Sequence, residues 1–160
     1  MTDPVCVISG VGPGTGSALA RRFARGGHRV AMLARNPQRL AELERELPYS
    51  KGYACDVSDA AQVEATADRI ERDLGVPTTL VHNAVGGAFG SFLEIDPAVL
   101  NRNFQVNTMG LLFLARRLTP VGVVAGGISS HTSLACENAC AWHPLTRRSN
   151  TTNRLGLAVL

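Results

Sequence analysis

Short apolar runs alternate with segments of helical periodicity over most of the first 118 residues. Runs of consecutive, mostly apolar positions are typical of strands covered on both faces, as in a parallel sheet. They occur at residues 5–9, 28–34, 51–55 and 78–82. Between and after them, apolar side chains recur every three or four positions, which predicts helices. These cover about residues 17–25, 37–47, 58–74 and 103–118.

Capping residues support these helices. Asn36-Pro37 is an N-cap followed by proline in the first turn, and Asp96-Pro97 repeats the signal ahead of the last helix. Gly26-Gly27 permits the left-handed backbone that often ends a helix. The apolar stripe of the last helix consists of Phe104, Leu111, Ala115 and Leu118.

The pattern changes at Pro120. Residues 121–128 are a candidate fifth strand, which three glycines weaken, and neither periodicity persists beyond residue 129. We therefore expect an α/β domain over residues 1–120, with a mainly parallel sheet of four or five strands flanked by helices. Residues 121–160 are expected to form a divergent, poorly ordered tail.

Composition narrows the class of protein. The chain has 160 residues, of which 45% are hydrophobic and 18% charged, as in one globular domain. Its net charge of +3 comes from arginines interspersed with acidic residues, which indicates solvated faces and no nucleic-acid patch. No apolar run reaches the roughly 18 residues of a membrane span, and no leader precedes the first strand. We expect a cytoplasmic protein without a membrane partner.

A glycine-rich stretch joins the first strand to the first helix. Gly10, Gly14 and Gly16 allow a sharp turn and the close approach of a ligand. The helix behind them offers unpaired N–H groups and a partial positive charge at its N-terminus. This combination predicts a site for the phosphates of a dinucleotide, although a glycine motif alone is weak evidence.

Three further motifs follow in order. Cys55-Asp56-Val57 ends the third strand, His82-Asn83-Ala84-Val85-Gly86 ends the fourth, and Val106-Asn107-Thr108-Met109-Gly110 lies in the last helix. Together with Ser9-Gly10-x-x-x-Gly14-x-Gly16, they resemble the short-chain dehydrogenase/reductase family of NAD(P)-dependent oxidoreductases. The resemblance covers about residues 5–120. It implies a Rossmann-type, doubly wound sheet, truncated relative to a complete member.

The resemblance also implies roles for individual residues. Gly10, Gly14 and Gly16 would hold the pyrophosphate, Asp56 the adenine amino group, and Asn107 a water of a proton relay. An alternative for Asp56 is to cap the helix that follows it. The whole expected cofactor-binding set is Gly10, Gly14, Thr15, Gly16, Arg35, Asp56, Val57, Asn83, Ala84 and Gly86.

The end of the second strand bears on the choice of cofactor. Enzymes of this type that use NAD end that strand with an acidic residue, which repels a 2′-phosphate. Ala34 stands there, and Arg35 follows with a guanidinium suited to a phosphate. We therefore expect NADP(H) in preference to NAD, the alternative being that Arg35 is a solvated loop residue.

The catalytic pattern of the family is incomplete. Its members use a serine and Tyr-x-x-x-Lys, but the tyrosines here are Tyr49 and Tyr53 and the one lysine is Lys51, all around the third strand. Ile128-Ser129-Ser130 is similar to the strand ending that carries the family's catalytic serine, so Ser130 is the candidate for that serine. A His-x-x-x-Arg pair, His143 and Arg147, is a disfavoured substitute. A zinc site is likewise disfavoured, because the spacing of its four candidate ligands departs from Cys-x-x-Cys. Those candidates are His131, Cys136, Cys140 and His143.

The expected function is that of an NADP(H)-dependent oxidoreductase acting on a small carbonyl or alcohol substrate, present here as its cofactor-binding half. Without Tyr-x-x-x-Lys, this chain alone is predicted to be inactive. Two alternatives are a non-catalytic dinucleotide-binding module and an inactive truncated or frameshifted product. The incomplete sheet would expose an edge strand, and this edge would favour association into a homo-oligomer.

Overall fold

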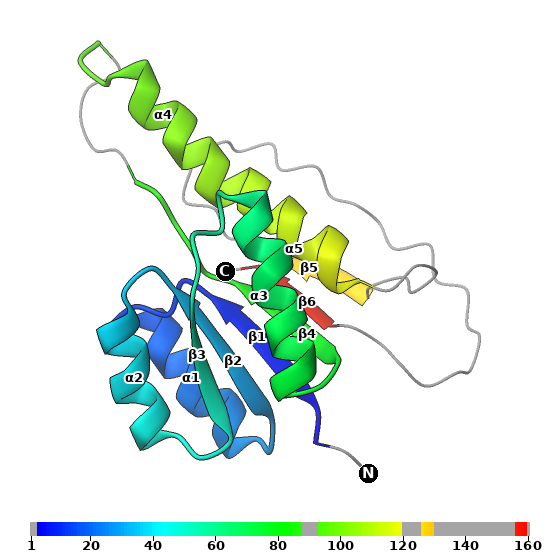
Figure 1. Cartoon of the computed structure of the whole chain (residues 1–160). Coiled ribbons are helices and arrows are strands. Elements are labelled where there is room, and N and C mark those ends of the chain that lie inside the picture. The colour runs from blue at the N-terminus through cyan, green and yellow to red at the C-terminus, as the bar shows by residue number, and fades with distance from the viewer. Residues whose placement is uncertain (1–2, 88–92, 120–125, 130–155, 160) are drawn as a thin grey trace.

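A computed structural model describes residues 3–87, 93–119, 126–129 and 156–159 (Figure 1). They form one sheet with the strand order β3-β2-β1-β4-β6-β5, in which every neighbouring pair is parallel. The strands are β1 (Val5–Ser9), β2 (Arg29–Ala34), β3 (Ser50–Ala54), β4 (Pro77–His82), β5 (Gly126–Ser129) and β6 (Gly156–Val159). The helices are α1 (Thr15–Arg25), α2 (Pro37–Glu46), α3 (Ala60–Asp73), α4 (Pro97–Phe104), the π-helical segment η1 (Gln105–Met109) and α5 (Gly110–Leu118).

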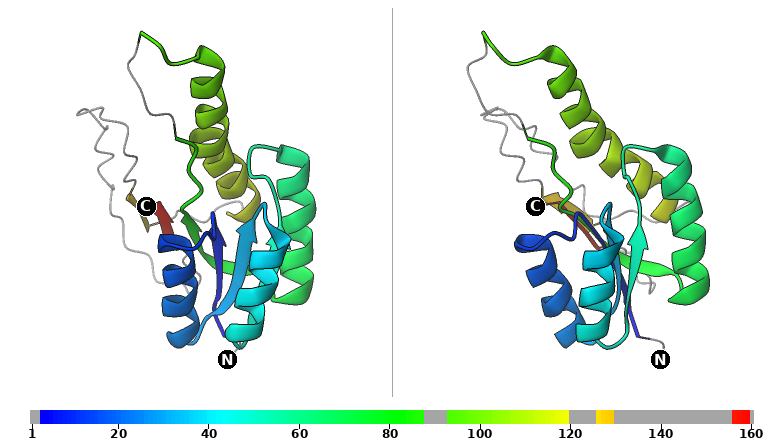
Figure 2. Two further views of the ribbon diagram at one scale, coloured as in Figure 1. Left: turned by 90° about the vertical axis from the view of Figure 1, so that its left-hand side faces the viewer. Right: turned by 60° about the vertical axis from the view of Figure 1, so that its left-hand side comes forward.

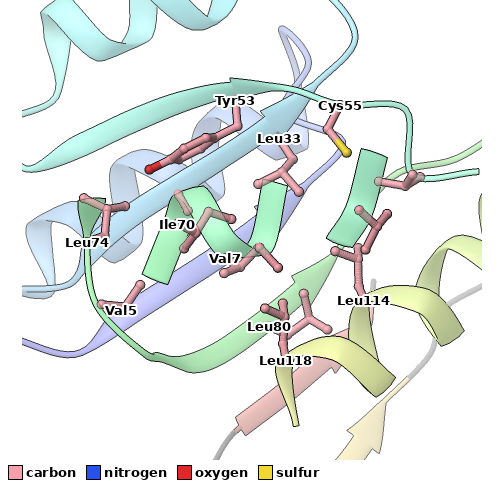
Figure 3. Packing of buried hydrophobic residues seen from close by; sticks show 14 residues of the cluster. Val5, Val7, Leu33, Tyr53, Cys55, Ile70, Leu74, Leu80, Leu114 and Leu118 are labelled. Atoms are coloured by element: carbon pink, nitrogen blue, oxygen red, sulfur yellow. The ribbon is translucent and has the colours of Figure 1, made fainter. Parts of the chain in front are cut away.

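Helices cover both faces of the sheet (Figures 1 and 2). Along β1, Val5 and Val7 join a core cluster with α3 and α5, whereas Cys6 and Ile8 join a second cluster with α1 and α2. Figure 3 shows the first cluster, in which Leu80 of β4 lies beside side chains of α5. Burial on both faces explains the continuous apolar runs, and it confirms the doubly wound α/β fold.

The last helix is longer than predicted. It begins at Pro97 and not near residue 103, because Asp96 caps it by accepting a hydrogen bond from the Ala98 N–H at 2.8 Å. Its predicted apolar stripe is also partly wrong, since Phe104 is 51% exposed whereas Leu114 is buried. In an unbroken α-helix, Phe104 and Leu118 would share a face. The π-helical turn of η1 takes up one residue more than an α-helical turn, so Phe104 is rotated away from the core.

The sheet also has one strand more than expected. Gly156–Val159 forms β6, which pairs with β4 on one side and β5 on the other. The order therefore differs from the 3-2-1-4-5-6 of the Rossmann fold at this point. A four-residue segment is too short to show periodicity, so only its pairing identifies it. The predicted poor order of the tail concerns residues that, from 130 to 155, lie outside those that the structure describes.

Within the part of the chain that the structure describes, no helix combines the length and the apolar character needed to span a bilayer.

Candidate functional site

A pocket of about 1020 Å³ opens at the carboxyl ends of β1, β2 and β4. The chain leaves β1 toward the face of α1 and leaves β4 toward the face of α5, so the pocket lies at a topological switch point. Residues of the β3–α3 loop and of α4 complete its wall. The lining includes Gly10, Gly14, Thr15, Gly16, Arg35, Arg39, Asp56, Val57, Asn83, Ala84, Gly86, Arg102, Asn103 and Val106. All ten predicted cofactor-binding residues are therefore brought together.

Two glycines are required by close backbone packing in the segment that joins β1 to the first turn of α1, called here the glycine loop (residues 10–16). Gly10 has a φ of +78°, and a Cβ there would strike the backbone of Ala84. A Cβ on Gly16 would strike the Gly10 carbonyl and come within 2.8 Å of the Val11 Cα. These positions hold the glycine loop against the start of the β4–α4 loop.

Gly14 has a different environment, because a Cβ built on it meets no atom within 4 Å. It is the N-cap residue of α1, and no side chain caps that helix end. The Ser17 hydroxyl donates to the carbonyls of Pro13 and Gly14, at 3.1 and 3.0 Å, which holds the loop in shape. Gly14, Thr15 and Gly16, at the start of α1, thus line the pocket beside an open position, an arrangement suited to an anion.

Two arginines line the pocket beyond β2. Arg35 directly follows the strand, and Arg39 lies in the first turn of α2, which Asn36 caps by accepting a hydrogen bond from the Arg39 N–H at 3.2 Å. Neither guanidinium forms an ion pair with another described residue, whereas Arg21 pairs with Glu46 at 2.6 Å. Sequence reasoning missed Arg39, although its position one turn after Arg35 was a usable signal.

Asp56 does not cap α3, so that alternative is wrong. The N-cap is Asp59, whose carboxylate accepts hydrogen bonds from the Ala61 and Gln62 N–H groups. One oxygen of Asp56, Oδ1, accepts from the backbone and hydroxyl of Ser58 at 3.0 and 2.7 Å. This fixes the Asp56 carboxylate at the wall of the pocket.

Val57 both lines the pocket and belongs to the core. Its side chain is buried and packs against α5, where a Cβ on Gly110 would come within 2.9 Å of the Val57 Cγ2. The glycine at position 110 thus lets the last helix approach the β3–α3 loop closely.

Two asparagines fasten the loops around the pocket. Asn83 Nδ2 donates to the Gly10 carbonyl at 2.8 Å, which joins the end of β4 to the glycine loop. Asn107, within η1, clamps Gly86: its Oδ1 accepts from the Gly86 N–H at 2.7 Å, and its Nδ2 donates to the Gly86 carbonyl at 3.2 Å. Its expected part in a proton relay stays a prediction.

A buried polar pair lies under this assembly. Ser9 and His82 are partners in the β1–β4 register, and Ser9 Oγ lies 2.8 Å from His82 Nδ1. Burial lowers the pKa of His82, and the backbone of Val106 and Asn107 offsets part of that shift. Sequence reasoning placed His82 in a motif but gave its side chain no role.

The tyrosine and lysine side chains of the described residues lie away from the pocket. Tyr53 Oη is 3.2 Å from Asp73, and Lys51 Nζ pairs with the same carboxylate at 2.9 Å. Burial, followed by the Asp73 charge, raises the pKa of Tyr53, which makes it a poor proton donor. The candidates Ser130, His131, Cys136, Cys140, His143 and Arg147 lie outside the described residues.

A doubly wound parallel sheet with a glycine loop and an uncapped helix at its switch point defines the class of dinucleotide-binding α/β domains. The sequence profile described as "short chain dehydrogenase" matches residues 4–144, and the chain belongs to that family of oxidoreductases.

Individual relatives agree with this assignment. The chain is 33% identical over 129 residues to 2-(S)-hydroxypropyl-CoM dehydrogenase 3 of Xanthobacter autotrophicus, a match that covers 78% of this chain and 50% of the relative. Its fold is similar to that of actinorhodin polyketide ketoreductase with NADPH (TM-score 0.70, 25% identity, 74% of this chain and 48% of the other). It is equally similar to 3-ketoacyl-(acyl-carrier-protein) reductase from Brucella melitensis complexed with NADH (TM-score 0.70, 27% identity, 74% and 50%). The chain thus spans about half the length of these proteins.

Proposed function

We propose that this chain is the cofactor-binding half of an NADP(H)-dependent oxidoreductase that acts on a small carbonyl or alcohol substrate. The observation that supports it most is the pocket itself. There, an uncapped helix N-terminus, two arginines without ion-pair partners among the described residues, and a fixed aspartate surround one cavity. Solved structures similar to this chain include one with NADPH and one with NADH. Family membership alone therefore does not decide which of the two cofactors this chain binds.

Arg35 and Arg39 favour the phosphorylated cofactor. A 2′-phosphate carries negative charge, and two guanidinium groups offer it charge-assisted hydrogen bonds. Ala34, at the end of β2, supplies no carboxylate to repel it. In this proposal the glycine loop and the first turn of α1 receive the pyrophosphate, Asp56 receives the adenine amino group, and NADP(H) supplies or accepts the hydride when bound.

A titration with nucleotide tests the proposal. We expect NADPH to bind with higher affinity than NADH, measured by nicotinamide fluorescence. Replacing Arg35→Ser should weaken NADPH binding about tenfold, because a hydrogen bond to a charged group contributes about 1.5–3 kcal/mol. The affinity for NADH should stay unchanged.

Arg25→Ser is the matched control, since Arg25 is an exposed arginine in the last turn of α1, at the far end from the pocket. Equal weakening of both nucleotides by Arg35→Ser would contradict the assignment of the 2′-phosphate site. Absence of any fluorescence change at millimolar nucleotide would contradict dinucleotide binding altogether.

A non-catalytic dinucleotide-binding module is the second candidate. The observation in its favour is that Tyr53 and Lys51 lie outside the pocket and are engaged with Asp73. We expect this chain alone to show no loss of NADPH absorbance with a panel of ketones, because no acid in the described pocket is suited to protonate the developing alkoxide. Turnover would favour the oxidoreductase over the module.

A further inference from the structure

His82 is the last residue of β4 and the register partner of Ser9, the residue that precedes the glycine loop. It is 2% exposed and follows Leu80 and Val81 at the end of β4. Leu80 belongs to the core cluster on the side of α5, so His82, two residues later, projects to the same side. Its Nδ1 is 2.8 Å from Ser9 Oγ, but Nε2 has no hydrogen bond of good geometry to another described residue.

The π-helical turn disturbs the hydrogen bonds of the facing helix. The Gly110 N–H donates to the Gln105 carbonyl, five residues back. In an α-helix the same N–H would donate to the Val106 carbonyl, four residues back. The turn therefore removes the usual donor of the Val106 carbonyl, and a buried carbonyl without a donor is costly.

These two features meet. Val106 packs against the core cluster that contains Leu80, on the side to which His82 projects. In agreement with this placement, the backbone of Val106 and Asn107 offsets part of the lowering of the His82 pKa, as an acceptor near a protonated ring nitrogen does. The Ser9 hydroxyl of β1 contacts the other ring nitrogen, and no charged side chain of the described residues contributes to the shift of the His82 pKa.

We propose that His82 is a positioning residue that holds the π-helical turn, and with it Asn107, over the pocket. The Ser9 hydroxyl donates to Nδ1, which leaves the proton on Nε2. The Nε2–H then donates to the backbone carbonyls that the π turn leaves without an α-helical donor, chiefly that of Val106. Because Asn107 clamps Gly86 through both ends of its amide, the ring supports the wall of the pocket from beneath.

Matched substitutions test the role of each ring nitrogen in the full chain. Glutamine places an N–H near the position of Nε2, whereas asparagine reaches only as far as Nδ1. We expect His82→Asn to speed hydrogen exchange of the Met109 and Gly110 amides about tenfold, and His82→Gln to stay within about twofold of the wild type. His28→Asn, at a histidine outside the pocket, is the control. Equal rates in the Asn and Gln variants would overturn the proposal.

The wild-type protein supplies a test that does not depend on the folding of a variant. Nitrogen NMR of the ring should report the neutral tautomer with the proton on Nε2, and a proton on Nδ1 would overturn the proposal.

The affinity for NADP+ gives a third test, which, unlike the exchange rates and the tautomer, rests on the proposed function. We expect NADP+ affinity at pH 7.5 to fall about fivefold in His82→Asn and to be restored in His82→Gln. Loss of affinity in both variants alike would overturn the positioning role. If the wild type binds no dinucleotide, the proposed function fails, whereas the exchange rates and the tautomer still decide the role of His82.

Discussion

Glycines in the glycine loop serve two different purposes. Gly10 and Gly16 are confined by neighbouring backbone, so their missing side chains allow the loop to pack. Gly14 faces open space at the pocket, so its missing side chain leaves room for a ligand. One motif therefore combines a requirement of the fold with a requirement of binding.

Substitutions at these two kinds of position should separate stability from affinity. Gly14→Leu is expected to leave the unfolding midpoint nearly unchanged and to weaken NADPH binding about tenfold or more, because the side chain occupies the pocket. Gly16→Ala should instead lower the free energy of unfolding by about 1–3 kcal/mol through overpacking. Urea unfolding and fluorescence titration of both variants measure the two effects.

Retention of normal NADPH affinity in Gly14→Leu would show that the phosphate lies elsewhere.

At the level of elements, one arginine adds ion pairs to the hydrophobic packing between the last helix and α3. Arg117 of α5 contacts Glu64, Asp68 and Glu71, with its nearest atoms at 3.0, 2.6 and 2.8 Å. The three carboxylates lie on one face of α3 and would repel one another without it. Hydrogen bonds to Glu71 and Asp68 raise the pKa of Arg117 further, so it stays charged.

Replacing Arg117→Met keeps the aliphatic stem and removes the charge. We expect the free energy of unfolding to fall by about 1 kcal/mol at low salt, with much of the difference lost in 1 M NaCl, because partly exposed ion pairs are screened. Arg116→Met, at the exposed neighbouring arginine, is the control. A loss that is independent of salt would indicate that packing of the stem dominates.

At the level of the whole molecule, stability should depend on the protonation of His82. Burial holds its pKa below the ordinary value of 6.5. The unfolded chain therefore binds more protons than the folded one as the pH falls below 6.5, and the free energy of unfolding decreases there. Above that pH the ring is neutral in both states and makes no pH-dependent contribution.

Comparison with His82→Gln isolates this effect, because glutamine does not titrate. We expect the urea midpoint of the wild type to drop more steeply than that of the variant between pH 7 and pH 5, in proportion to the free energy linked to one proton. Parallel pH profiles would mean that His82 is not the titrating group.

Much of the fold was predictable because burial on both faces leaves a clear pattern. Strands β1 and β2 read as apolar runs, and Asn36-Pro37 marked the start of α2. The glycine spacing and Arg35 likewise identified most of the pocket. The start of the last helix was misjudged because the periodicity of its α5 part does not continue through η1.

The sequence by itself determined the α/β class, the position of the glycine loop and the absence of Tyr-x-x-x-Lys, because these depend on local pattern and residue type. Tertiary structure decided that Asp59 and not Asp56 caps α3, that Gly156–Val159 pairs with β4, and that Ser9 meets His82 beneath η1. The strand pairing and the Ser9–His82 contact join segments that are far apart in the chain, so no local pattern predicts them. The cap depends on which of two nearby carboxylates the fold places at the unpaired N–H groups that begin α3.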